Sequence, residues 1–65
     1  MESKGVVRKF FEEKGQLLVS FPNHDGYFHA PADDAGMRAK ITESRDSKKE
    51  LSFTFDKDLK ILSIR

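Results

Sequence analysis

Alternation of apolar and polar residues along short segments is the feature that most limits how this chain can fold. In residues 15–21, Leu17, Val19 and Phe21 point to one side of an extended chain. The same period of two occurs in residues 37–42 and 51–55. Because successive side chains of a β-strand point to opposite faces, this period is typical of half-buried strands. The sequence therefore predicts at least three strands and an all-β fold.

Three further segments are predicted as strands with interruptions. Residues 6–11 are rich in β-branched and aromatic residues but have apolar groups on both faces, which indicates a strand with a bend or bulge. Residues 27–30 form a short strand ended by Pro31, and residues 59–64 form a last strand whose apolar phase shifts. Turn residues at 12–15, 22–26 and 56–58 predict antiparallel neighbours.

The remaining segments are expected to contain little regular structure. Residues 31–36 follow a proline with Ala and Asp, so we expect one helical turn, stopped by Gly36. The polar run 43–49 is expected to be a loop or the tip of a long hairpin. Five or six short strands with one helical turn after the third predict a small antiparallel barrel of the oligonucleotide/oligosaccharide-binding (OB) type. A Src-homology-type barrel stays open as the alternative.

Length and composition set the limits of this fold. We expect one small domain, residues 1–65, and the absence of cysteine leaves no disulfide or thiolate metal site to stabilise it. No apolar run approaches the ~20 residues of a membrane span, so we expect no membrane insertion and a cytoplasmic location. Residues 15–36 contain three Asp and no Lys or Arg. The charge imbalance is therefore weaker than a duplex-binding protein usually shows.

The first half of the chain carries a more specific pattern. Residues 4–15 read Lys-Gly-Val-Val-Arg-Lys-Phe-Phe-Glu-Glu-Lys-Gly, and residues 25–29 read Asp-Gly-Tyr-Phe-His. Over about 30 residues this pattern resembles a cold-shock domain, a family of OB-fold proteins that bind single-stranded nucleic acid. The positions that carry the resemblance are Gly5, Val7, Arg8, Phe10, Lys14, Gly15, Val19, Phe28 and His29.

The chain departs from the family at four aromatic positions. Lys9 stands where the family has its stacking tryptophan, Gln16 and Leu18 where it has aromatic residues, and Ala30 where it has the aromatic residue after histidine. Each base stacked on an aromatic ring contributes about 1–3 kcal/mol, so these losses predict weakened binding. The resemblance implies that Tyr27 and His29 stack bases.

The resemblance implies weak binding of single-stranded RNA or DNA. The cationic side chains of Arg8, Lys9 and Lys14 are expected to compensate in part for the missing rings by contacting phosphates. The residues predicted to bind nucleic acid are Arg8, Lys9, Phe10, Lys14, Leu18, Tyr27 and His29.

A second hypothesis is a protein-interaction or regulatory module that has lost nucleic-acid binding. It is favoured by the missing aromatic residues, the acidic middle of the chain and the apolar residues Phe11, Leu18 and Leu62, expected to be exposed. Under this hypothesis a protein partner, or a second copy of the chain, binds along an open strand edge.

Catalysis, metal binding and a cofactor are not expected. The sequence has no cysteine nucleophile and no Gly-rich phosphate loop, and no Ser/His/Asp arrangement is predicted to come together. His24, Asp25 and His29 are suitable ligand types, but a surface histidine beside Asp is common.

Overall fold

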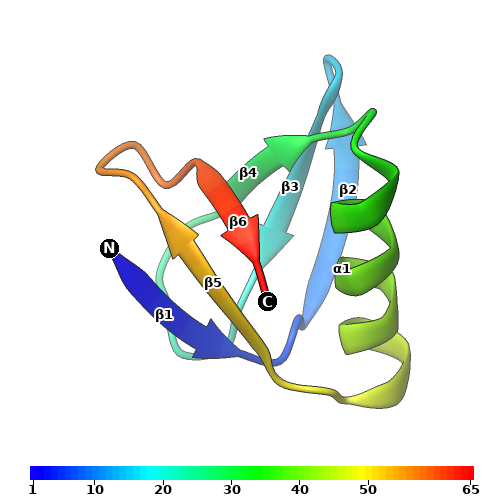
Figure 1. The fold of residues 1–65 in the computed structure, drawn as a ribbon, viewed down its shortest axis with the longest axis vertical. Helices are drawn as coiled ribbons and strands as arrows, with labels where there is room; N and C mark the ends of the chain where they lie inside the picture. Colours follow the sequence, from blue (N-terminus) through cyan, green and yellow to red (C-terminus); the bar gives the residue numbers. More distant parts are fainter.

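Six short strands and one helix make up the fold. The computed structural model describes residues 1–65, and Figure 1 shows the helix running along one side of the two sheets. The elements are β1 (Glu2–Gly5), β2 (Lys9–Glu13), β3 (Gln16–Ser20), β4 (Phe28–Pro31), α1 (Ala35–Ser47), β5 (Leu51–Phe55) and β6 (Ile61–Ile64). The strands form two antiparallel sheets of three, in the orders β1-β5-β6 and β2-β3-β4.

The predicted closed barrel is wrong. The two sheets are joined by the chain between β1 and β2, and at β4 and β6 by one parallel bridge between His29 and Lys60. At that bridge the backbone N–H of His29 donates to the carbonyl oxygen of Leu59 over 2.9 Å. β6 begins only at Ile61 because a turn occupies the residues after Asp56, whose backbone N–H and Oδ1 bond Lys60. The contact between β4 and β6 therefore stays too short to close a barrel.

The predicted strand over residues 37–42 is also wrong, as are the single helical turn and the loop on either side of it. These segments form one helix, α1, of 13 residues. Gly36 lies inside the first turn of the helix instead of ending it. Ile41 and Ser44, three residues apart, are the buried residues of the helix, and this spacing is helical.

Both ends of α1 are capped. At the start, Oδ1 of Asp34 accepts a hydrogen bond from the N–H of Met37 over 3.0 Å. At the end, Lys48 adopts the left-handed conformation, with φ of 58°, and its N–H bonds the carbonyl oxygen of Ser44. These caps define the helix within a segment whose apolar residues also fit a strand.

The predicted first strand, 6–11, is only partly correct, because residues 9–11 belong to β2 whereas residues 6–8 form the connection between β1 and β2. Val7 lies at the break and is buried, and its N–H donates to Oγ of Ser44 over 2.9 Å. The N–H of the next residue, Arg8, donates to the carbonyl oxygen of Ser20 over 2.9 Å. The chain thus turns from one sheet into the other at Val7. By contrast, the prediction of a strand at residues 51–55 is confirmed by β5.

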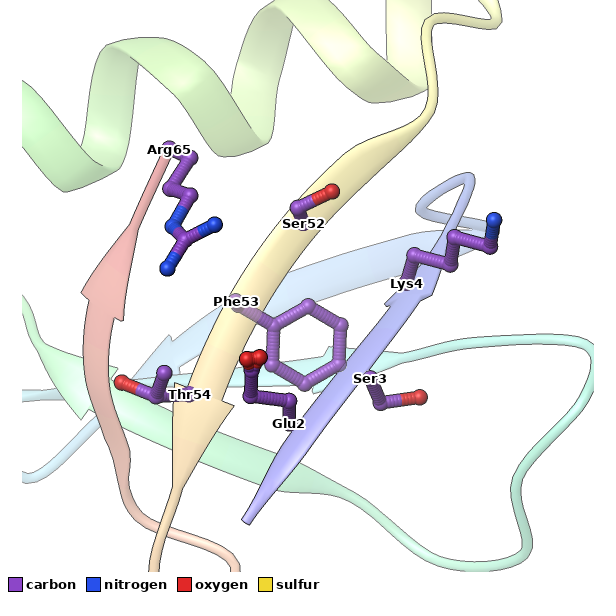
Figure 2. A pocket seen from close by; sticks show the side chains of 7 residues that line it. All are labelled: Glu2, Ser3, Lys4, Ser52, Phe53, Thr54 and Arg65. Atoms are coloured by element: carbon purple, nitrogen blue, oxygen red, sulfur yellow. The ribbon is translucent and has the colours of Figure 1, made fainter.

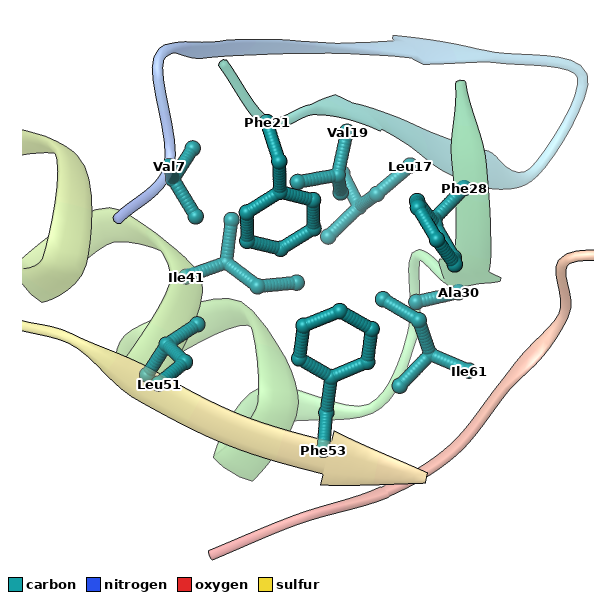
Figure 3. Packing of buried hydrophobic residues seen from close by; sticks show 10 residues of the cluster. All are labelled: Val7, Leu17, Val19, Phe21, Phe28, Ala30, Ile41, Leu51, Phe53 and Ile61. Carbon is teal, nitrogen blue, oxygen red and sulfur yellow. The ribbon is translucent and has the colours of Figure 1, made fainter. Parts of the chain in front are cut away.

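The core lies between the two sheets and α1. In Figure 3 aromatic rings fill its centre, and Phe21 and Phe53 are stacked with centroids 4.8 Å apart. Phe28 meets both of these rings edge-on, at 5.5 and 5.2 Å. The buried apolar residues are Val7, Leu17, Val19, Phe21, Phe28, Ala30, Ile41, Leu51, Phe53 and Ile61. Because this core takes up one face of β2-β3-β4, it decides which side chains lie on the other face.

Candidate nucleic-acid interface

The outer face of the β2-β3-β4 sheet carries a row of three side chains. Leu17 and Val19 on β3, and Phe28 on β4, are buried in the core. Their neighbours Leu18 and His29 therefore point outward, because side chains alternate along a strand. The strand register places Phe11 opposite Leu18, and Leu18 opposite His29. At about 4.8 Å between strands, the row is about 10 Å long.

Tyr27 extends this row into an aromatic surface. Its ring meets the ring of Phe11 edge-on, with centroids 5.5 Å apart and planes at 79°. Phe11 is 42% exposed and Tyr27 is 38% exposed, so both rings are open to a ligand. Nζ of Lys9 lies 6.0 Å from the centroid of Tyr27. We call Phe11, Leu18, Tyr27 and His29 the aromatic face.

The loop between β5 and β6 fixes His29 at one end of the aromatic face. Nε2 of His29 lies 3.1 Å from the carbonyl oxygen of Asp58, and because a carbonyl oxygen only accepts, Nε2 is the donor. Oδ1 of Asp56 accepts from the N–H groups of Asp58 and Lys60, at 2.9 and 3.0 Å. The Lys60 bond is the main cause that lowers the pKa of Asp56, and the Asp58 bond and the charges of His29 and Lys60 act in the same direction. The hydrogen bonds to Asp56 therefore order the loop, and the loop in turn fixes the position of the His29 ring.

A polar hollow of about 220 Å³ lies at the other end of the aromatic face, next to Tyr27. Nη2 of Arg8 donates to Oγ of Ser20 over 3.0 Å inside it. The hollow is lined by Arg8, Ser20, Phe21, Pro22, His24, Asp25, Gly26 and Tyr27. Two of the predicted binding residues, Arg8 and Tyr27, therefore share one concave site.

The structure brings most of the predicted binding residues to this sheet face, but not all of them. Arg8, Lys9, Leu18, Tyr27 and His29 lie on the aromatic face or at its ends.

Phe10 points to the opposite side, where it packs against the core beneath the guanidinium of Arg45, 4.7 Å from the ring centroid. Lys14 lies in the turn between β2 and β3, with φ of 51°, at the far end of the hairpin from Lys9. Neither is placed to share a ligand with Tyr27.

Phe11 is the residue that the sequence-based list of binding residues missed. The sequence does indicate an exposed ring here, because adjacent residues of a strand point to opposite faces and only one of Phe10 and Phe11 can enter the core. The resemblance led to Phe10, since that position matches the cold-shock pattern and position 11 does not.

A second hollow, of about 270 Å³, lies on the outer face of the other sheet (Figure 2). It is lined by Glu2, Ser3, Lys4, Ser52, Phe53, Thr54 and Arg65. Phe53 is its only apolar residue and is 2% exposed, so its ring belongs to the core. This hollow offers mixed charges and hydroxyl groups but no exposed ring, and the aromatic face is the better candidate for binding a base.

Metal ligands and membrane segments are not evident. The structure gathers no three His, Cys, Asp or Glu side chains in a geometry that could hold a metal ion. The helix is too short and too polar to cross a membrane.

Comparisons with known proteins give no match to this chain, whether with family models, with curated proteins or with solved structures. The resemblance to cold-shock domains therefore stays a prediction that rests on the residues of the first half.

Proposed function

We propose that this protein binds single-stranded RNA or DNA through the aromatic face of the β2-β3-β4 sheet. The observation that carries the proposal is the exposed pair of Phe11 and Tyr27, with Lys9 beside it. Nucleic-acid bases stack on exposed aromatic rings, and the phosphates between them are attracted to nearby cations. The surface combines both features on one sheet.

The expected affinity is low. Phe11, Tyr27 and His29 are the rings available for stacking, and each stacked base is worth about 1–3 kcal/mol. Leu18 occupies the centre of the row and offers apolar contact without a ring. Part of the stacking energy offsets the entropy lost on ordering the strand, so dissociation constants in the micromolar to millimolar range are expected.

The cations around the aromatic face determine the dependence on salt. Arg8 and Lys9 lie near Tyr27, and Lys60 lies next to His29 at the opposite end. Each phosphate that a cation neutralises adds about −0.7 to the slope of log affinity against log salt for a single strand. With all three cations on phosphates the slope is about −2, and with Lys9 and Lys60 alone on phosphates it is about −1.4, so it should lie between these two values.

An NMR titration of the ¹⁵N-labelled protein with oligouridylate, at low and at physiological salt, tests the proposal. Amide shifts should concentrate at Lys9, Phe11, Tyr27 and His29 and be larger at low salt. Thr54 and Ser63, which are hydrogen-bonded to each other on the other sheet, serve as internal controls and should not move. Absence of shifts at both salt concentrations, or shifts centred on Thr54, would contradict the proposal.

A protein partner for the same face is the second candidate, and the position of Leu18 favours it. An aliphatic residue at the centre with Phe11 beside it and charged residues around resembles the core and rim of a protein interface.

The free edge of β1 is partly engaged, because Asn23 Nδ2 donates to the carbonyl oxygen of Lys4 and Ser3 Oγ bonds His24 Nε2. Pairing of a protein partner or of a second copy along an edge strand stays a prediction, and sedimentation of the protein alone tests the second copy.

A further inference from the structure

The polar hollow beside Tyr27 contains a cationic and an acidic side chain, Arg8 and Asp25. Base stacking needs neither of them, but recognition of a particular base does. We call this hollow the Arg8 pocket, using the lining residues given above. Its volume of about 220 Å³ is below the ~300–1,000 Å³ of small-molecule sites, which suits one planar group and not a large ligand. It adjoins an exposed ring of the aromatic face, so a strand bound there can place one base in the pocket.

Arg8 supplies hydrogen-bond donors at a fixed place. Its backbone N–H bonds the carbonyl oxygen of Ser20, and its Nη2 bonds Oγ of the same residue. A guanidinium has five N–H donors, so this anchoring leaves others for a ligand. Arg8 takes part in none of the ion pairs of the molecule.

Asp25 supplies acceptors in the same pocket. It is exposed and it, too, takes part in no ion pair. The next residue, Gly26, has φ of 76° and open space where a Cβ would lie, so a ligand can approach the backbone there. A carboxylate repels phosphate, and therefore the occupant that suits both Arg8 and Asp25 has acceptors and donors of its own.

We propose that the Arg8 pocket takes one guanine base of the bound single strand, an inference that rests on the function proposed above. Guanine carries two adjacent acceptors, O6 and N7, which match the paired donors of an arginine. It also carries donors at N1 and N2, which a carboxylate such as that of Asp25 accepts. The ring of Tyr27 forms an aromatic wall against which the base stacks.

The other bases fit this pair of side chains less well. Adenine has an amino group where guanine has O6, so it faces the arginine with a donor. Cytosine likewise presents an amino group at that position, and uracil lacks the amino group that corresponds to N2 of guanine. One well-made bidentate contact discriminates between bases by about 5- to 150-fold, and this is the preference expected for guanine.

Fluorescence anisotropy with labelled oligouridylates tests the inference. The probes are all-uridine, one central guanosine, one central adenosine, and one central inosine, which is guanosine without the N2 amino group. The wild type should bind the guanosine probe about 5- to 150-fold more tightly than the adenosine probe, with inosine between them. In D25A the guanosine and inosine probes should bind equally, because the acceptor of the N2 amino group is gone.

D33A serves as the matched control, since Asp33 is also an exposed aspartate of a loop but lies outside the pocket. It should keep the full preference for guanosine. Measurable binding of all four probes with equal affinity by the wild type would overturn the guanine pocket and leave the proposed function in place. Binding of none of them would overturn both, and a preference that D25A leaves unchanged would remove Asp25 from recognition.

Discussion

Ser44 shows how one polar side chain can join three parts of a small fold. It is fully buried on α1, where its Oγ accepts from the N–H of Val7 and donates to the carbonyl oxygen of Lys49. Val7 lies where the chain passes from β1 to β2, and Lys49 precedes β5. One hydroxyl therefore connects the break between the sheets to the end of the helix.

Replacing Ser44 with alanine should lower the free energy of unfolding by about 1–3 kcal/mol, because the buried N–H of Val7 loses its acceptor. Alanine also has the higher helix propensity, which opposes this loss. S47A, at an exposed position of the same helix, has the same change in propensity without the buried bonds and is the matched control. Urea denaturation of both variants separates the two effects, and equal stability of the two would contradict a structural role for this hydroxyl.

Asp56 gives the folded protein a stability that depends on pH. Its pKa in the folded state lies below the ordinary value of about 3.9, mainly because the N–H of Lys60 donates to the carboxylate. The ionised form is therefore favoured by folding, so the contribution is present above about pH 4 and is lost as the pH falls through the lowered pKa. D56N should be less stable than the wild type at neutral pH, and the difference should shrink in acid.

Thermal unfolding of D56N and the wild type between neutral and acidic pH measures this difference. D58N is the control, because residue 58 takes part in the loop through its backbone and not through its carboxylate. A gap between D56N and the wild type that stays constant with pH would show that the charge of Asp56 plays no part in stability.

The helix α1 is the element where sequence reasoning and structure differ most, and its residues explain why. Met37, Ala39 and Ile41 fit a period of two, but Met37 and Ile41, four apart, fit a helical period equally well. The next buried helix residue is Ser44, which is polar and so does not extend an apolar pattern. A prediction based on apolar residues alone therefore does not identify the buried face of this helix.

The N-cap of α1 provides a direct test of the helix. D34A should destabilise the protein by about 1 kcal/mol, because the N–H of Met37 loses its acceptor. Asp33, the adjacent and exposed aspartate, is the matched control, and D33A should change stability by no more than about 0.5 kcal/mol. Chemical denaturation followed by far-UV circular dichroism compares the two, and a larger effect of D33A than of D34A would place the cap at the wrong residue.

The sheets were easier to predict than their relation to each other. β5 follows strict alternation, and β3 alternates the buried Leu17 and Val19 with Gln16 and Leu18, so the existence of both strands and their buried apolar residues were evident from the sequence. Alternation within one strand does not say which residues of two strands share a face, and the register is what places Leu18 and His29 side by side. The relation between the sheets depends on the turn after Asp56, which delays β6, and on the break at Val7. The first is a local turn held by several hydrogen bonds to Asp56, and the second depends on one hydrogen bond between Val7 and Ser44, which are far apart in the sequence. Apolar periodicity predicts neither of them.

At the scale of the whole molecule, the two sheets share one core and use their outer faces differently. The outer face of β1-β5-β6 carries hydroxyl and charged groups, as at the hollow in Figure 2, whereas that of β2-β3-β4 carries exposed rings. Phenylalanine therefore has two roles in this chain. Phe53 is stacked on Phe21 in the core and is 2% exposed, whereas Phe11 is 42% exposed.

The pair F53A and F11A separates folding from binding with the same chemical change. F53A removes a ring from the centre of the core and should cost about 3–5 kcal/mol. A domain of 65 residues has a total stability of roughly 3–10 kcal/mol, so this variant should be largely unfolded or close to it. F11A removes a partly exposed ring that meets Tyr27 edge-on and lies opposite Leu18, and it should change the free energy of unfolding by about 1 kcal/mol.

Oligonucleotide binding is informative for F11A and not for F53A, because a largely unfolded variant loses the aromatic face together with its fold. F11A keeps the fold, so any loss of oligonucleotide affinity, expected at about 1–3 kcal/mol, reports on the aromatic face alone. Urea denaturation and an oligouridylate titration on the same samples give both quantities. A folded F11A that binds as the wild type does would show that the ring of Phe11 takes no part in binding. A fully stable F53A would contradict a core that both sheets share, because a cavity at its centre removes packing for each of them.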